Sequence, residues 1–219
     1  MTQGQESSHG NGYRDDLKML LESQGQTVNM VGSHWSGEMR DNRHEGWSGW
    51  VIDDIAGKAK NSLPVYKPNV VTLLAGTNDA KAHTTKSDQE YGIVMRDRLN
   101  NMIKTIFEHV PDVLLVVSKL PPCADPKAPW AQGHVTAYNS HIPDLVKAWA
   151  DGEKSNGQKK HIAMIDAGKV LQVSDLVDGT HPGDKGYARL GNEWYKAIVE
   201  HKEWIKEPVD IPAKDKGIW

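Results

Sequence analysis

The sequence predicts a three-layer α/β domain in which helices cover both faces of a parallel sheet. Segments with helical spacing of apolar residues alternate with short segments of strand length along most of the 219 residues, which is the order in which βαβ units are built. The segments 69–74 and 113–117 are almost continuously apolar, as expected for strands that are buried on both faces. The length suits one domain, which we place at 1–206, followed by a charged tail at 207–219.

The first half of the chain is expected to contain two helices, two strands and a long loop. Leu17, Leu20 and Leu21 recur at helical spacing before Gly25, so 13–24 is predicted to form an amphipathic helix. The elements expected next are a strand at 27–31, a loop at 32–49, a helix at 51–60 and the buried strand at 69–74. Loops as long as 32–49 are usually functional or disordered.

The second half continues the alternation. A long amphipathic helix is expected at 88–109 and a central strand at 113–117. A proline-rich connection at 120–133 leads into a helix at 135–150, which Pro143 should kink or split. The last elements expected are a strand at 161–165, a turn at 178–182 and a closing helix at 187–205.

One element of such a fold is absent from this order. A doubly wound domain normally begins with a central strand that leads into its first helix, whereas this chain opens on the loop before that helix. We therefore expect the first central strand of the sheet to be missing from this chain.

Composition gives little support to several classes of partner. The formal net charge of −3 provides no general attraction to nucleic acid or to anionic membranes, and no apolar run approaches the length of a membrane span. The polar N-terminus carries no signal peptide. The compartment is left open, since a leader could have been lost together with the missing strand. We expect a monomer.

Cysteine and histidine usage argues against structural disulfides, metals and cofactors. The single cysteine, Cys123, excludes an internal disulfide framework and has no basic neighbour that would activate its thiol. Ten histidines are present, but none of the usual ligand spacings for zinc occurs, and His134 and His141 lack a visible third ligand. No phosphate-binding glycine loop is present either, so we expect no metal and no cofactor.

The stretch Asp178–Pro182 is the strongest candidate for chemistry. Asp178 precedes His181 by three residues in a turn that Gly179 and Pro182 define, so a carboxylate can orient an imidazole that acts as a general base. The alternative is a plain turn in which Asp178 or Thr180 caps the following helix.

Two further segments could supply hydrogen-bond donors for a developing negative charge. Asn78 follows the strand at 69–74 within Gly76–Asp79, and its amide could donate to an oxyanion. Gly49 is expected to start the helix after the long loop, where a free backbone N–H would point outward. Each segment is equally explained by ordinary turn or helix-start chemistry.

Together, these motifs resemble those of the SGNH (GDSL-type) hydrolases. The resemblance rests on Gly76–Asp79 after a central strand, Ser48–Gly49 before the preceding helix and Asp178–His181 before the last helix, and it covers nearly the whole chain. The stretches 44–53 and 178–187 look most like the secreted branch related to carbohydrate esterase family 3. The resemblance implies a flavodoxin-like sheet, a carboxylic-ester substrate, His181 as base, Asp178 as its orienting partner, and Gly49 and Asn78 as oxyanion donors.

The nucleophile is where the sequence departs from that pattern. Alignment of Ser7–Arg14 with the corresponding family segment places Gly4 and Thr2 on the end of the family's Gly-Asp-Ser-Ile-Thr-x-Gly block. The catalytic serine would then precede Met1, and Ser7 and Ser8 are poor substitutes because they match a connecting loop. We expect weak or no esterase activity from this chain, through either a truncated gene model, which we favour, or a shortened paralogue.

Tryptophans are the candidate substrate contacts. Trp35, Trp47 and Trp130 fall in or beside loops at the expected carboxyl ends of strands, where an indole could stack on a sugar ring or an acyl group. For Trp50, as for Trp149 and Trp194, a place in the core is favoured. The function predicted from sequence is hydrolysis of acetyl or short acyl esters on small-molecule or polysaccharide substrates, at no more than a weak rate in this form. The alternative is a non-catalytic carbohydrate- or acyl-binding remnant.

Overall fold

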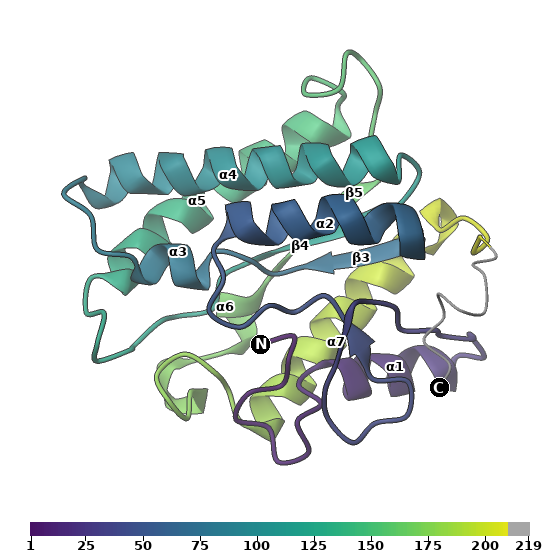
Figure 1. Cartoon of the computed structure of the whole chain (residues 1–219), viewed down its shortest axis with the longest axis horizontal. Coiled ribbons are helices and arrows are strands. Elements are labelled where there is room, and N and C mark those ends of the chain that lie inside the picture. Colours follow the sequence, from purple (N-terminus) through teal and green to yellow (C-terminus); the bar gives the residue numbers. More distant parts are fainter. Residues whose placement is uncertain (210–219) are drawn as a thin grey trace.

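The computed structural model describes residues 1–209 and contains a parallel sheet with helices on both faces (Figure 1). Three strands lie in the order β3 (Val70–Leu73), β4 (Leu114–Lys119) and β5 (Ile162–Asp166). Leu73 pairs with Val117, and Ser118 pairs with Ile165, both in parallel register. The α/β class with a parallel sheet, predicted from the alternation of segments, is confirmed.

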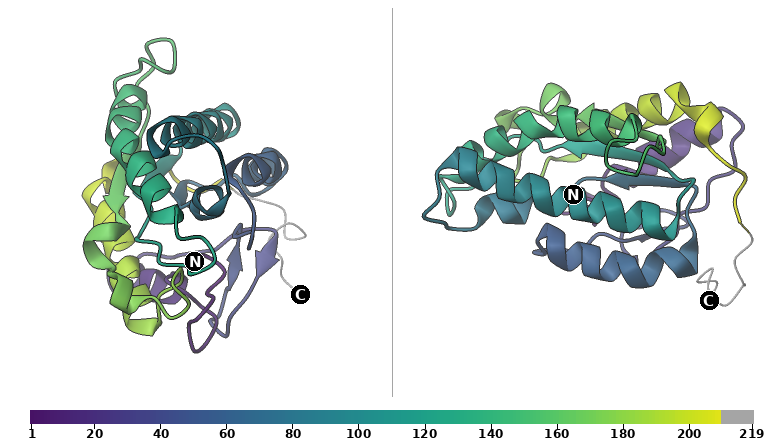
Figure 2. Two further views of the ribbon diagram at one scale, coloured as in Figure 1. Left: turned by 90° about the vertical axis from the view of Figure 1, so that its left-hand side faces the viewer. Right: turned by 90° about the horizontal axis from the view of Figure 1, so that it is seen from above.

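Strand β4 separates two hydrophobic cores. Leu115 and Val117 point into one core, which is formed with α2 (Ile52–Tyr66), α4 (Asp88–His109) and α5 (Ala131–Ala150). Leu114 and Val116 point into the other, which is formed with α1 (Arg14–Ser23) and α7 (Asp184–Glu200). Because side chains alternate along a strand, the continuous apolar run of β4 fills both cores. Figure 2 shows the helices on the two sides of the sheet.

The long helices agree well with the pattern of the sequence. Helix α4 has the predicted bounds and begins with a capping box between Ser87 and Glu90. Helix α5 starts earlier than expected and continues through Pro143, so of the two outcomes predicted there, a kink or a split, the split does not occur. Ile142 and Leu145 on either side are buried in the core, and this packing outweighs the one hydrogen bond that a proline removes. Trp149 and Trp194 are buried, as predicted.

The region between α1 and α2 differs from the prediction. The expected strand at 27–31 does not form, because no other described strand pairs with it. The expected loop at 32–49 instead contains a small antiparallel pair, β1 (His34–Trp35) and β2 (Arg43–His44). Strand β3 pairs with β4 alone and forms one edge of the described sheet.

A buried arginine anchors this small pair of strands. Arg14, which is 2% exposed, was not singled out from the sequence. Its guanidinium donates to backbone oxygens on both sides of the small sheet and in the N-terminal loop, namely those of Thr2, Gly10, Ser36 and Asn42. The side chain therefore links the small antiparallel pair to the N-terminal loop.

Short helices complete the chain. They are α3 (Thr77–Lys81), α6 (Ala167–Val170) and the 3₁₀ turns Val173–Asp175 and Lys202–Trp204. Of the tail predicted at 207–219, residues 210–219 lie outside the described part of the chain. Within residues 1–209, no helix combines the length and the apolar composition that a bilayer crossing requires.

Substitution by alanine is expected to have opposite effects on stability at two helical glycines, Gly57 and Gly92. A Cβ at Gly92 would lie 2.7 Å from the Ala137 Cβ and 2.9 Å from its carbonyl carbon, whereas a Cβ at Gly57 meets nothing within 4 Å. We expect Gly57→Ala to stabilise the fold by roughly 0.5–1 kcal/mol. Gly92→Ala should destabilise it, since α4 and α5 must separate. Urea unfolding of both variants tests this, and a stabilised Gly92→Ala variant would contradict the close packing of the two helices.

Candidate active site

Asp178 and His181 form a hydrogen-bonded pair in the turn before α7. His181 Nδ1 lies 2.8 Å from Asp178 Oδ2, while Asp178 Oδ1 accepts from the N–H groups of Thr180 at 2.9 Å and His181 at 2.7 Å. Helix α7 begins only at Asp184, with Gly183 at its N-cap. Neither Asp178 nor Thr180 caps the helix, and the aspartate instead fixes the ring and the turn that carries it.

The turn is held against the loop between β4 and α5. Gly179 has a φ of +79°, and a Cβ at this position would lie 2.5 Å from the Ala124 carbonyl oxygen. The Gly179 carbonyl accepts from the Ala124 N–H at 2.7 Å, and the Val177 N–H donates to the His181 carbonyl at 2.8 Å. A glycine is required here because the backbones approach closely in a left-handed conformation.

The surroundings keep the aspartate ionised and the imidazole neutral. Burial of Asp178 opposes ionisation, but hydrogen bonds from His181 and Thr180 prevail and lower the pKa of the carboxyl from 3.8 to about 2. Burial lowers the pKa of His181 below 6.5, and the hydrogen bond to Asp178 opposes this only in part. At neutral pH the pair therefore has the charge state of a general base with an anionic partner.

Asn78 contacts the segment that contains Gly49. Asn78 lies in α3, which follows β3 through Gly76, and its Nδ2 donates to the Trp50 carbonyl at 3.0 Å. Gly49 is exposed, with a φ of +80°. It does not start the helix as predicted, because α2 begins at Ile52. A side-chain amide has two N–H donors, so a second one stays available beside this turn.

The pair Asp178 and His181, called the dyad below, and Asn78 lie at the same rim of the sheet. Lys81 shares α3 with Asn78, and its charge contributes to the lowered pKa of His181. Lys81 Nζ also lies 2.6 Å from Asp125 Oδ2 in the loop after β4. The segments that follow β3 and β4 and the turn that carries His181 therefore converge where the carboxyl ends of parallel strands meet.

The first residues of the chain also lie at this rim. The amino group of Met1 is buried beside the dyad; burial lowers its pKa to about 6, an effect that the charge of Asp178 opposes. Ser7 Oγ donates to the Gly4 carbonyl at 2.8 Å, and Ser8 Oγ donates to Asp184 at 2.8 Å. Within residues 1–209, no hydrogen bond joins a serine hydroxyl to His181.

Trp47 is part of an aromatic cluster rather than a free surface. The rings of His34 and Trp47 are nearly perpendicular, with their centroids 4.0 Å apart, and the Trp50 ring lies at 4.8 Å. Lys58 Nζ lies over both indoles, at 4.9 Å and 5.3 Å from their centroids. Trp50, predicted to lie in the core, is only half-buried. The cluster thus braces the loop that carries Gly49.

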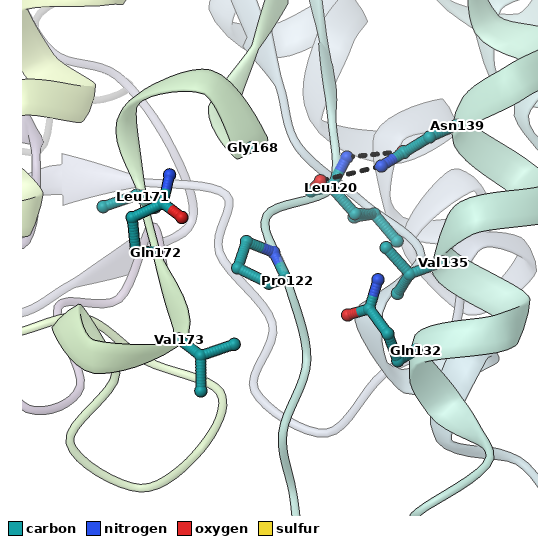
Figure 3. Close-up of a pocket in the computed structure, with 9 residues that line it drawn as sticks. All are labelled: Leu120, Pro122, Gln132, Val135, Asn139, Gly168, Leu171, Gln172 and Val173. Atoms are coloured by element: carbon teal, nitrogen blue, oxygen red, sulfur yellow. Dashed lines mark hydrogen bonds between the residues drawn. The ribbon is translucent and has the colours of Figure 1, made fainter.

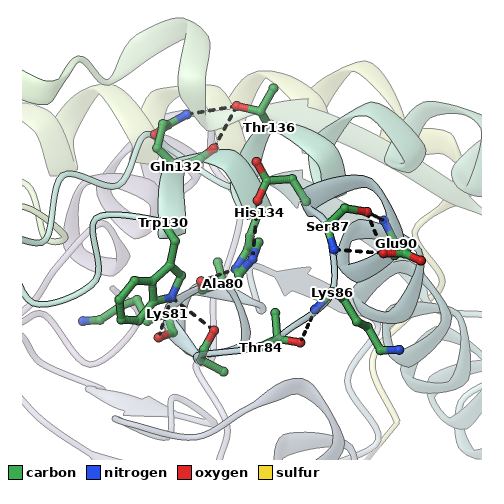
Figure 4. Close-up of polar contacts among 12 residues, drawn as sticks. Ala80, Lys81, Thr84, Lys86, Ser87, Glu90, Trp130, Gln132, His134 and Thr136 are labelled. Atoms are coloured by element: carbon green, nitrogen blue, oxygen red, sulfur yellow. Dashed lines mark hydrogen bonds and ion pairs between the residues drawn. The ribbon is translucent and has the colours of Figure 1, made fainter.

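Trp130 holds the segment after α3, as Figure 4 shows. Its Nε1 donates to the carbonyls of Lys81 at 3.2 Å and Ala82 at 3.1 Å, and its ring lies perpendicular to that of His83 at a centroid distance of 5.1 Å. Trp35 differs from these two, because it is 66% exposed, and the Arg43 guanidinium lies 5.1 Å from the centre of its ring. Of the three candidates, Trp35 presents the most open indole.

A cleft that the sequence did not predict lies between the loop after β4 and the segment around α6 (Figure 3). Its volume is about 220 Å³, and Leu120, Pro122, Val135 and Leu171 supply apolar walls. The Asn139 amide is bonded to both the N–H and the carbonyl of Leu120, at 2.8 and 2.9 Å. The cleft is bordered by the loop after β4, which also holds the turn of Asp178 and His181, but none of the predicted site residues lines it.

Within residues 1–209, no cluster of three His, Cys, Asp or Glu side chains suits a metal ion.

Comparisons with known proteins bear on the family and the fold of the chain. The model of the GDSL-like lipase/acylhydrolase family matches residues 1–189. A family 3 carbohydrate esterase of Clostridium thermocellum superposes with a TM-score of 0.74 and 29% identity, over 94% of each chain. One from Talaromyces cellulolyticus superposes with a TM-score of 0.74, over 91% of this chain and 94% of that one, at 22% identity.

A longer relative extends the comparison. A multidomain esterase of Ruminococcus flavefaciens is 25% identical over 217 residues, covering 85% of this chain. The chain spans 26% of the length of that relative, so it corresponds to one part of a larger protein there.

The charge state of His181 is open to a direct test. Because Asp178 raises the pKa of His181 against the effect of burial, Asp178→Asn should lower the pKa of the ring further below 6.5. NMR titration of the ring carbons measures both values. Asp184→Asn, which removes a carboxylate bonded to Ser8 instead, should leave the pKa unchanged. A value at or above 6.5 in the unmodified chain would be incompatible with the buried pair.

Proposed function

The chain belongs to the GDSL-like lipase/acylhydrolase family, and we propose that its site acts on short acyl esters, above all acetyl esters of carbohydrates. The observation that carries the proposal is the 2.8 Å contact between His181 Nδ1 and Asp178 Oδ2 at the rim that also holds Asn78. The similarity to a family 3 carbohydrate esterase over nearly the whole chain supports the choice of substrate.

In the proposed reaction, the residues divide into a base and a pair of oxyanion donors. A serine hydroxyl attacks the acyl carbon and gives its proton to His181 Nε2, while Asp178 stabilises the imidazolium that forms. The carbonyl oxygen becomes an oxyanion, which accepts hydrogen bonds from the Gly49 N–H and the Asn78 amide. His181 then protonates the leaving alcohol, and water repeats the sequence on the acyl-serine.

We propose that neither Ser7 nor Ser8 is the serine of this reaction. Ser7 and Ser8 are bonded to Gly4 and to Asp184, and we propose that the 219 residues alone hydrolyse esters weakly or not at all. The same observation favours a second function, in which this chain binds acyl or carbohydrate ligands without turnover. In both cases the oxyanion donors bind the acyl group.

Supplying a serine tests the reaction directly. We compare the 219-residue chain with two extended chains, which add an apolar strand and Gly-Asp-Ser or Gly-Asp-Ala directly before Met1. The serine form should hydrolyse p-nitrophenyl acetate roughly 10³-fold faster than the alanine form, since only it offers a nucleophile to His181. His181→Ala in the serine form should abolish that gain.

Two results would count against this assignment. Serine-dependent turnover by the 219-residue chain at the rate of the serine-extended form would show that a nucleophile is already present. A serine-extended form that folds and remains inactive would remove His181 and Asp178 from the role of base and orienting partner.

Trp35 is the proposed contact for the carbohydrate. One face of its indole lies beside Arg43, and its high exposure leaves area for the apolar face of a sugar ring. We expect Trp35→Ala to weaken binding of acetylated xylan by roughly two- to tenfold, in line with the free energy of an aromatic contact, with no change for free acetate. Isothermal titration measures both affinities. Met19→Ala, which removes an exposed apolar side chain of α1, is the control, and an equal loss in both variants would contradict a specific platform.

A further inference from the structure

We propose that Asp79 is a positioning residue, which holds the Gly49 turn and the Asn78 amide at the separation that an oxyanion requires. This inference rests on the proposed function. The Asp79 side chain is fully buried, and its Oδ2 accepts from the Ile52 N–H at 2.9 Å. Its Oδ1 accepts from Arg98 Nη1 at 2.7 Å. Asp79 was noted in the sequence only as part of the Gly76–Asp79 block.

The two neighbouring residues Asn78 and Asp79 connect to the same segment in complementary ways. Asn78 Nδ2 donates to the Trp50 carbonyl at 3.0 Å, and Asp79 accepts from the Ile52 N–H two residues further on. One connection uses a donor and the other an acceptor, so the backbone at 50–52 can neither shift nor rotate without losing a bond. Gly49 directly precedes this segment, and its N–H is thereby set relative to the Asn78 amide.

Arg98 extends the connection to a third helix. Its Nη1 pairs with Asp79, and its Nε lies 3.1 Å from Asp53 Oδ2. Asp53 belongs to α2, Asp79 to α3 and Arg98 to α4. The positions of the two candidate donors therefore depend on α4 through the buried Asp79, and the exposed Asp53 adds only a weaker link to α2.

Asp79 is fully buried although its partner Arg98 is 31% exposed, and this placement of a carboxylate indicates that more than stability is involved. Burial raises the pKa of Asp79, and the hydrogen bonds from Arg98 and Ile52 oppose this effect. Replacement of a buried ion pair by apolar side chains is often neutral or stabilising. An apolar side chain at 79 could fill the space, but it could not accept the Ile52 N–H. The acceptor is the property that the site requires.

The test separates the acceptor from the charge with two matched double variants. Asp79→Asn/Arg98→Met removes both charges and leaves an amide oxygen, free of Arg98, to accept from the Ile52 N–H. Asp79→Ala/Arg98→Met removes both charges and the acceptor. The probe is sodium acetate, titrated into the ¹⁵N-labelled 219-residue chain at constant ionic strength, with the Gly49 N–H and the Asn78 side-chain amide followed by NMR. Thermal unfolding is measured in parallel.

We expect acetate to shift both signals in the unmodified chain. The asparagine variant should bind acetate within about twofold of that affinity, and the alanine variant should bind roughly fivefold more weakly, as expected for one lost backbone hydrogen bond. Asp53→Asn, which removes only the exposed partner of Arg98, should bind acetate normally. A purely structural role for Asp79 would lower the melting temperature of the alanine variant and leave its acetate affinity intact, and that result would overturn the inference.

The outcomes also separate this inference from the proposed function. If acetate shifts neither Gly49 nor Asn78 in the unmodified chain, the oxyanion site itself is wrong, and the role of Asp79 falls with it. If acetate binds the unmodified chain and both double variants equally, the site stands and Asp79 does not position it.

Discussion

The whole site depends on β4 being buried on both of its faces. Leu115 and Val117 fill the core with α2, α4 and α5, and Leu114 and Val116 fill the core with α1 and α7. A strand buried in this way needs neighbours in register and helices above and below. Parallel register then brings the ends of β3 and β4 to one rim. Gly76 and Ala124 follow these two strands, and through them the fold brings Asn78 and the turn of Asp178 and His181 to the same rim.

Backbone contacts, more than side-chain packing, fix the groups at that rim. Asp178 accepts two backbone N–H groups besides the imidazole, Gly179 pairs with Ala124, and Asn78 is bonded to the Trp50 carbonyl. Such contacts fix the positions of the site residues closely, and they require glycine where two backbone segments approach each other. This explains why the site consists of short motifs with glycine, aspartate and asparagine, which can be recognised in a sequence, while the helices that support it need only an apolar stripe.

The sequence was informative wherever a local pattern decides the structure. The apolar runs predicted β3 and β4, the spacing of apolar residues predicted α4 to the residue, and the spacing of Asp178 and His181 predicted their contact. It failed where distant contacts decide. The extended segment 27–31 has strand composition but no partner strand, and the pair β1 and β2 depends on Arg14, whose four backbone acceptors lie in three separate segments. The roles of Asp79 and Arg98 also depend on tertiary contacts, because nineteen positions separate them.

The two carboxylates near the site, Asp178 beside His181 and Asp79 beside Asn78, differ in their exposure to water. The difference suits the chemistry proposed for each half of the site. Asp178 is 42% exposed, so water still reaches the carboxylate that partners the proposed base. A base must take up a proton and release it within one cycle, and a partly solvated partner permits both states. On the donor side, a second carboxylate lies next to Asn78 in sequence but is fully buried. An unpaired negative charge there would oppose an oxyanion, and Arg98 neutralises it at 2.7 Å. Asp79 can therefore act as an acceptor for α2 without repelling the charge that the neighbouring amide is proposed to stabilise.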